Sequence, residues 1–277
     1  MIFTKMHGAG NDYIYVDCFI EDVSDPESLA KQLSRHHFGI GADGLVLIKP
    51  SQKADCFMDI YNADGSRAKM CGNAVRCTAK YIFDNRIKKS AISIDTLSGI
   101  KAVEIFSENG VAIGGKVNMG KPIFNGHSIP TRYGTSIVKG EILNIEGMDY
   151  EITCLSMGNP HCVVFCEDTE KIPLHKIGEK FENHEMFPQR INTEFVQVLN
   201  ENHLKMRVWE RGSGETLACG TGACASAVAA VLNGHCQKNT EIEIQARGGV
   251  LFVNWCKNDN VYLSGNAVEV FSGRINL

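Results

Sequence analysis

The stretch Ala218-Cys-Gly-Thr-Gly-Ala-Cys-Ala-Ser-Ala-Val-Ala-Ala-Val-Leu232 contains the feature that decides the fold. From Ala223 to Leu232 it has no charged residue, and its side chains are small or aliphatic. A helix that is apolar on every face must be buried on every face, and this one is too short to span a bilayer. The sequence therefore predicts a central helix wrapped by a sheet. Asn233-Gly234 ends it, because glycine commonly follows a helix's last turn.

A second helix, predicted over Ala74–Phe83, has the same place in the first half of the chain. Each helix follows a Cys-Gly pair, and a shift of 148 positions places Cys71-Gly72 on Cys219-Gly220. Matches that keep their order along a chain indicate two homologous halves, which we expect to be related by a pseudo-two-fold axis. The other matches include Gly10-Asn11 on Gly158-Asn159, Met58 on Met206 and, after a slip to 150 positions, Ile92-x-Ile94 on Ile242-x-Ile244.

Most of each half reads as strands bounded by Gly, Asn and Asp. The predicted strands are Tyr13–Asp17, Leu45–Ile48, Phe57–Tyr61, Ala91–Asp95 and Ile100–Ile105, then Cys162–Phe165, Glu194–Leu199, Leu204–Glu210, Glu241–Gln245 and Val250–Trp255. This pattern predicts an α+β fold of two pseudo-symmetric domains, each a barrel-like mixed sheet wrapped around a central helix. The first domain comprises residues 1–118 with about 266–277, and the second comprises residues 119–265.

Composition excludes several classes of protein. The chain has 277 residues, 28 Lys and Arg, 32 Asp and Glu and a net charge of −4, so nothing favours binding to nucleic acid. The chain has no run of 18 apolar residues, so no membrane span is predicted. Met1–Asp12 lacks the apolar core of a signal peptide. Eleven cysteines, an odd number without any C-x-x-C, indicate free thiols in a reducing cytoplasm and not zinc ligands.

Cys71 and Cys219 each precede a predicted helix N-terminus, where we expect Asn73 and Thr221 to be the N-caps. A helix N-terminus carries partial positive charge and unpaired N–H groups, so it should lower the pKa of the thiol and bind a carboxylate. Two such ends facing one carboxylate would place one sulfur on each side of its α-carbon. That arrangement suits inversion of the α-carbon, in which one group removes a proton and the other delivers one to the opposite face.

Six motifs together resemble the diaminopimelate epimerase family, nearly end to end from Lys5 to Gly265. The proline racemases, which share the two cysteine motifs, carry His at the position of Asn73, so this residue and the pair Glu210-Arg211 make the resemblance specific. The motifs are Gly8-Ala-Gly-Asn-Asp12, Gly39-Ile-Gly-Ala-Asp-Gly44, Met70-Cys-Gly-Asn73, Gly158-Asn-Pro-His161, Trp209-Glu-Arg-Gly212 and Ala218-Cys-Gly-Thr-Gly-Ala223.

The resemblance implies an isomerase that converts LL-2,6-diaminopimelate to the meso form for lysine and peptidoglycan precursors, without cofactor or metal. It implies a cytoplasmic homodimer, a small-molecule amino-acid substrate and an active site in the cleft between the domains. Cys71 and Cys219 would be the acid/base pair. The other implied residues are Gly72, Asn73, Gly220 and Thr221 at the reacting carboxylate, Asn62, Asn192 and Arg211 at the distal end, Asn11, Asn159 and Glu210 near the reacting centre, and His161 in support of the cysteines.

Two positions depart from the family's pattern. Position 44 is Gly, where some relatives have a side-chain amide, and position 74 is Ala, where the family usually has Gly. Alanine at position 74 would be strained if the backbone there needs a positive φ. The equivalent position in the second half keeps Gly222.

Three other functions compete with this interpretation. A proline- or hydroxyproline-type racemase would act on a small cyclic amino acid that has no second charged end. A thiol redox sensor or metal-binding protein would use the same cysteines and would purify with zinc or show a dithiol cycle. A non-catalytic amino-acid-binding module would keep its affinity after loss of either cysteine. A cysteine at each of two equivalent helix starts favours catalysis over the last two.

Overall fold

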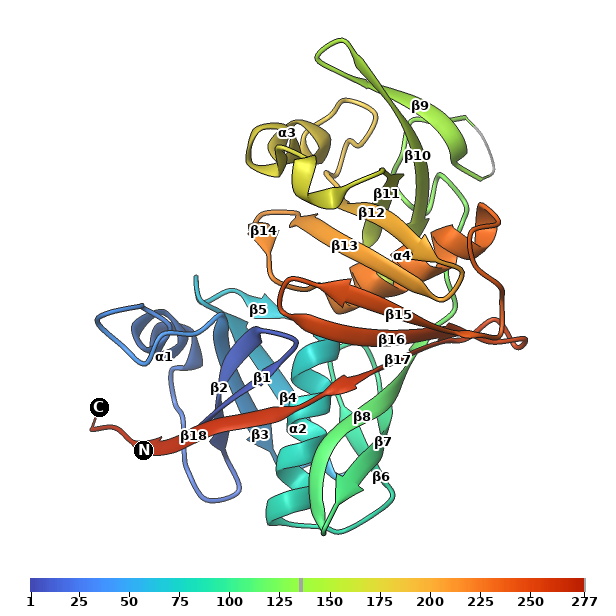
Figure 1. Ribbon diagram of the computed structural model, residues 1–277. Coiled ribbons are helices and arrows are strands. Elements are labelled where there is room, and N and C mark those ends of the chain that lie inside the picture. The colour runs from blue at the N-terminus through green and yellow to red at the C-terminus, as the bar shows by residue number, and fades with distance from the viewer. Residues whose placement is uncertain (135–136, 277) are drawn as a thin grey trace. The chain divides into compact units, whose positions relative to one another are not determined.

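The computed structural model describes residues 1–134 and 137–276 (Figure 1). The chain divides into two compact units, Met1–Asn118 with Ser264–Leu277, and Met119–Leu263. Strands of both parallel and antiparallel pairing surround one long helix in each unit. The predicted α+β class, with a barrel-like sheet around a central helix in each half, is confirmed.

The first unit contains both ends of the chain, and the Met1 amino group donates to the Ile275 carbonyl at 2.9 Å. Its helices are α1 (Pro26–Leu33) and α2 (Gly72–Asn85). Its strands are β1 (Ile2–Gly8), β2 (Asn11–Asp17), β3 (Gly44–Lys49), β4 (Cys56–Asn62), β5 (Arg67–Ala68), β6 (Ala91–Asp95), β7 (Lys101–Glu108), β8 (Val111–Gly120), whose last residues belong to the second unit, and β18 (Val268–Arg274).

The second unit has the helices η1 (Thr169–Lys171), α3 (Leu174–Glu182) and α4 (Gly220–Leu232). Its strands are β9 (Lys139–Ile145), β10 (Met148–Ser156), β11 (Pro160–Phe165), β12 (Asn192–Asn200), β13 (His203–Glu210), β14 (Gly214–Thr216), β15 (Glu241–Ala246), β16 (Gly249–Trp255) and β17 (Val261–Asn266), which runs back into the first unit. Among the described residues of the chain, no helix is long and apolar enough to cross a membrane.

The register of paired strands is the same at equivalent positions of the two units. In the first unit β2 runs parallel to β3 with Tyr13 opposite Gly44, and in the second β11 runs parallel to β12 with His161 opposite Asn192. Both partners are shifted by 148 positions between the units, as the sequence comparison predicts. The register after the slip agrees as well, since the antiparallel pairs Ile92–Val103 and Ile242–Val253 are 150 positions apart.

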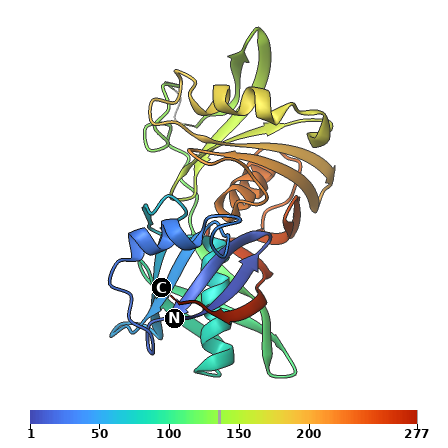
Figure 2. The ribbon, with the colours of Figure 1, turned by 90° about the vertical axis from the view of Figure 1, so that its left-hand side faces the viewer.

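The two long helices are the centres of their units. Helix α2 contacts β1, β2, β4, β6 and β7, and α4 contacts β10, β11, β12, β13, β15 and β16. Figure 2 shows α4 among the strands of its own unit. Every residue of α4 from Gly222 to Ala230 is buried. Small side chains leave room for strands on all sides, so the predicted burial of this helix is confirmed.

Both helices begin earlier than predicted, so the expectation that Asn73 and Thr221 are the N-caps is wrong. The N-caps are the cysteines themselves, both extended, with φ −140° and ψ 123° at Cys71 and φ −122° and ψ 116° at Cys219. The glycine after each cysteine adopts the helical conformation and becomes the first helical residue. Each sulfur therefore lies at the open end of its helix, where the first N–H groups have no partner within the helix backbone.

The two departures from the family pattern have structural explanations. Ala74 is a buried helical residue of α2 and is not among the residues with positive φ, so alanine is unstrained there. A Cβ atom at Gly44 would lie 2.1 Å from the Tyr61 carbonyl oxygen. The close approach of β3 to β4 therefore requires glycine at position 44.

We predict that Ala227→Leu destabilises the protein by about 1–3 kcal/mol, because a larger side chain overpacks the fully buried α4. The exposed Ala102→Leu in β7 is the matched control and should change stability by no more than about 0.5 kcal/mol. Urea denaturation followed by circular dichroism measures both. Equal stability of the two variants would contradict the all-round burial of α4.

Candidate active site

In the first unit the structure brings Cys71, Asn11 and Asn73 together at the start of α2. The Cys71 thiol donates to Asn11 Oδ1 at 3.3 Å, and Asn73 Nδ2 donates to the same oxygen at 3.5 Å. Asn11 Nδ2 donates to Asp43 Oδ2 at 2.7 Å. The carboxylate of Asp43 therefore fixes the Asn11 amide with its carbonyl oxygen toward the sulfur.

Arg76 is a residue that the sequence interpretation did not assign. Its side chain is fully buried in α2, where Nη2 donates to Asn73 Oδ1 at 2.8 Å and Nη1 donates to the Gly72 carbonyl at 3.2 Å. A Cβ atom at Gly8 would lie only 3.2 Å from Nη2, so the neighbouring strand leaves space for the guanidinium. Arg76 thus orients the Asn73 amide, which leaves Nδ2 free to face Asn11. The available signal was a charge within an otherwise apolar helix.

Asn62 is the remaining predicted site residue of the first unit. It lies at the end of β4, opposite Gly44 across the β3–β4 pair, and is half-buried. Its side chain bonds within its own turn, where Nδ2 donates to Ser66 Oγ at 2.9 Å.

In the second unit Cys219 lies at the N-terminus of α4 and is only 5% exposed. The Gly222 N–H donates to its sulfur at 3.4 Å, and the Thr221 hydroxyl lies 3.4 Å from it. Burial, followed by the charges of Glu210 and Glu194, raises the pKa of Cys219 well above its usual value. The expectation that the helix end lowers this pKa is therefore wrong for Cys219, since desolvation and two nearby carboxylates outweigh the helix end.

Glu210 ends β13 beside Cys219. Burial raises the pKa of its carboxyl group, and the nearby charge of Glu194 raises it further. The Thr216 hydroxyl donates to Glu210 Oε1 at 2.6 Å, which favours the ionised form and opposes that shift. The predicted residues Glu210 and Cys219 thus lie in one cluster of ionisable groups. Gly220 and Thr221, in the first turn of α4, follow Cys219 directly.

His161 is fully buried and connects this cluster to Asn159. Its Nδ1 lies 2.7 Å from Glu194 Oε1, and its Nε2 lies 3.0 Å from Asn159 Oδ1. Glu194 was also not assigned from the sequence, although a glutamate inside an apolar strand was a visible signal. A Cβ atom at Gly222 would lie 2.5 Å from Glu194 Oε1, so glycine at position 222 makes room for the carboxylate.

Asn192 and Arg211 form a second group of predicted residues in this unit. The buried Asn192 side chain donates to the Pro160 carbonyl at 2.8 Å and accepts the Arg211 backbone N–H at 2.9 Å. The Arg211 side chain is exposed, and its Nη1 donates to the Gln189 carbonyl at 3.0 Å. The backbone of the turn is thus fixed, while the guanidinium faces solvent.

Glu182, at the end of α3, holds that turn and was not predicted. Its carboxylate is 5% exposed and accepts from Trp209 Nε1 at 2.8 Å, the Gly212 N–H at 2.9 Å and Arg190 Nη1 at 3.0 Å. Three donors on one buried carboxylate fix the residues on either side of Glu210 and Arg211.

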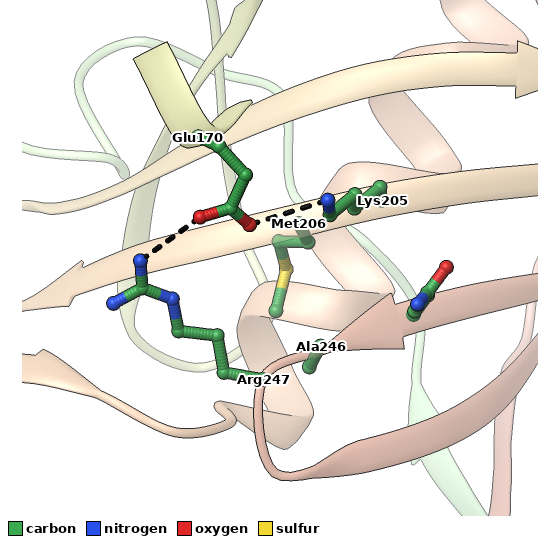
Figure 3. A pocket seen from close by; sticks show the side chains of 6 residues that line it. Glu170, Lys205, Met206, Ala246 and Arg247 are labelled. Carbon is green, nitrogen blue, oxygen red and sulfur yellow. Dashed lines mark hydrogen bonds and ion pairs between the residues drawn. The ribbon is translucent and has the colours of Figure 1, made fainter. Parts of the chain in front are cut away.

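Figure 3 shows a different pocket on the second unit, which none of these site residues lines. The carboxylate of Glu170 lies between Lys205 and Arg247, with both ion pairs at 3.2 Å, and Arg247 also pairs with Glu215 at 2.7 Å. We assign no function to it. Its lining residues are Glu170, Lys205, Met206, Gln245, Ala246 and Arg247.

Each unit therefore presents one thiol at the N-terminus of its central helix. Asn73 is bonded directly to the buried Arg76 in the first unit, and Asn159 is linked through His161 to the buried Glu194 in the second. Among the described residues, no group of three or more His, Cys, Asp or Glu side chains is placed to hold a metal ion. Such a site can exchange protons at sulfur and can bind an anion through the first-turn N–H groups.

The chain is similar to known proteins over most of its length. The family described as "Diaminopimelate epimerase" matches residues 3–125 and 153–270. A diaminopimelate epimerase of Acetivibrio thermocellus is 52% identical over 279 residues, covering 100% of this chain and 99% of the relative. Two solved structures share the fold at a TM-score of 0.72. They are a Bacillus anthracis phenazine biosynthesis protein of the PhzF family (17% identity, 100% and 99% coverage) and a probable proline racemase of Agrobacterium radiobacter (11% identity, 100% and 93% coverage).

We predict that Glu182→Gln loosens the turn at Trp209 and lowers stability by about 1–3 kcal/mol, because hydrogen bonds to a charged acceptor are lost. In ¹⁵N-labelled protein the Trp209 indole N–H signal should move, while that of Trp255, the second tryptophan, should stay. Glu179→Gln, on the exposed side of α3, is the matched control and should change neither. An unchanged Trp209 signal in Glu182→Gln would contradict the clamp.

Proposed function

The chain belongs to the diaminopimelate epimerase family, and on that premise we propose that Cys71 and Cys219 together epimerise LL-2,6-diaminopimelate to its meso form. The protein is an isomerase that serves lysine and peptidoglycan precursor synthesis. The observation that carries the two-thiol proposal is the equivalence of these cysteines, each of which is the N-cap of the central helix of its own repeat.

In this proposal the carboxylate next to the reacting carbon is bound at the starts of α2 and α4. The backbone N–H groups of Gly72, Asn73, Gly220 and Thr221 donate to it. Helix N-termini favour negative charge, and this charge grows when the α-proton leaves and electrons move onto the carboxylate. The two helix ends therefore stabilise the carbanion-like transition state more than the substrate.

The proton transfers balance over the two sulfurs. The Cys71 thiolate removes the α-proton from one face, and the Cys219 thiol delivers its proton to the other face. Cys71 then holds the thiol and Cys219 the thiolate, so the roles are exchanged for the reverse reaction. The raised pKa of Cys219, caused by burial and neighbouring carboxylates, supports Cys219 as the group that begins as the acid. Two thiols supply both steps, so we propose no cofactor and no metal.

Residues that bind the distal end of the substrate select for its length. We propose that Arg211, Asn192 and Asn62 bind the distal, non-reacting end, while Asn11, Asn159 and Glu210 orient the groups near the reacting carbon. The exposed guanidinium on a fixed turn supports this, because Arg binds a carboxylate through two parallel hydrogen bonds. A small cyclic amino acid has no second charged end to occupy such a site, so this feature favours diaminopimelate over proline.

We further propose that the protein is a cytoplasmic homodimer. The support for an interface is strand β18, where Val268, Val270 and Phe271 are 38%, 53% and 45% exposed. Val268 and Val270 are two positions apart and therefore lie on one face of the strand, and exposed apolar side chains that lie together favour association with another chain. Analytical ultracentrifugation of wild type and Val270→Lys tests this, since a dimer that becomes a monomer supports β18 as the interface and a monomeric wild type excludes it.

The assay that tests the function uses purified protein, LL-diaminopimelate, a chelator and no pyridoxal phosphate, followed by chiral analysis. We predict meso product from wild type and none from Cys71→Ala or Cys219→Ala, because proton transfer on two faces needs both thiols. The double variant should be no worse than either single one, since the residues act as a unit.

Cys18→Ala, at a half-buried thiol outside the site, is the control and should keep full activity. Substantial turnover by either single active-site variant would remove that cysteine from the proposed pair.

A further inference from the structure

The amides of Asn11 and Asn159, which are equivalent in the repeat, are oriented by partners of opposite kind. Asn11 donates through Nδ2 to the carboxylate of Asp43, so its oxygen is presented to Cys71. In Asn159 it is the oxygen, Oδ1, that lies 3.0 Å from His161 Nε2. The nitrogen of Asn159 is therefore the atom left for another partner, so one asparagine presents an acceptor and the other a donor.

The His161 ring faces an oxygen at each of its two nitrogens. Glu194 Oε1 lies 2.7 Å from Nδ1, and Asn159 Oδ1 lies 3.0 Å from Nε2. An ionised carboxylate and an amide oxygen only accept hydrogen bonds, so a ring that donates from both nitrogens satisfies both contacts. The other ionisable groups near this pair include Glu210 of β13, Cys219 at the start of α4 and Cys162 of β11.

The buried carboxylate of Glu194 favours a protonated, positively charged His161 beside it. Both Glu194 and His161 have no exposed surface, and Glu194 Oε2 has no hydrogen-bond partner among the described residues. A buried carboxylate is costly unless a charge of opposite sign and hydrogen bonds compensate for the lost water. In the first unit the equivalent positions are Val46 and Tyr13, so this pair belongs to the second unit alone.

We propose that Glu194 is a positioning residue for the epimerisation: it holds His161 in the doubly protonated form, and His161 holds Asn159 with Nδ2 turned toward the substrate. The inference rests on the proposed function, since the substrate is the one that this function assigns. Asn159 then donates to the reacting centre, where negative charge develops, while Asn11 offers an acceptor to Cys71. Glu194 itself touches no substrate.

The direct test is the protonation state of His161 in the full-length protein, read from ¹⁵N spectra of histidine-labelled samples, with His161→Gln used to assign the signal. At pH 7 we expect two protonated ring nitrogens in wild type and one in Glu194→Gln, whose neutral amide cannot balance an imidazolium. A singly protonated His161 in wild type overturns the proposal. The wild-type measurement alone decides this point, and it requires neither turnover nor a folded variant at position 194.

Kinetics supply the second test. Glu194→Gln should lower kcat about tenfold with little change in KM, the size expected for one charged hydrogen bond. Glu243→Gln is the matched control, because Glu243 faces His203 at 3.4 Å in a partly exposed pair, and it should leave kcat unchanged. A folded Glu194→Gln variant with wild-type kcat overturns the positioning role. A doubly protonated His161 in a protein without epimerase activity would overturn the proposed function and leave the Glu194–His161–Asn159 relay standing.

Discussion

A cysteine at the open end of a fully buried helix is the constraint on which the rest of this structure depends. Helix α4 can be buried on all sides only because its residues are small, and the strands around it follow from that. The same burial removes water from Cys219 and raises its pKa. Gly222, in the first turn, leaves the space into which Glu194 fits. Packing of the helix and chemistry at the sulfur are thus set by one choice of side-chain size.

The repeat supplies two similar helix ends, and the buried charges behind them make the ends different. Arg76 lies behind the start of α2, where it orients Asn73. Glu194 lies behind the start of α4, where it contacts His161. A reaction that removes a proton on one side and delivers one on the other needs one sulfur to begin as base and its partner as acid. Opposite charges behind equivalent sulfurs are a physical means to that difference.

Sequence patterns predicted the repeat, the ten strands named from it and both central helices, because alternation and small-residue runs are local signals. Helix α1 was missed although Asp25 caps it and Pro26 opens it, since its short apolar stripe is weak. The N-caps were predicted two residues too late, because the glycine after each cysteine is already helical. The pKa of Cys219 was predicted wrongly, because its burial and the approach of Glu194 from another strand depend on tertiary structure. Glu182 could not be found from the sequence for the same reason: its three donors come from two other segments of the chain, at Arg190 and at the turn from Trp209 to Gly212.

The central claim is that two thiols act on opposite faces of one carbon, and hydrogen isotope transfer in D2O tests it most directly. Starting from LL-diaminopimelate, NMR of the first few per cent of product should show deuterium at the inverted carbon of the meso isomer. The remaining LL substrate should stay largely unlabelled, because the sulfur that removes the proton is not the one that delivers deuterium. Meso product that retains the original hydrogen would contradict the two-thiol account, even if both cysteines proved essential.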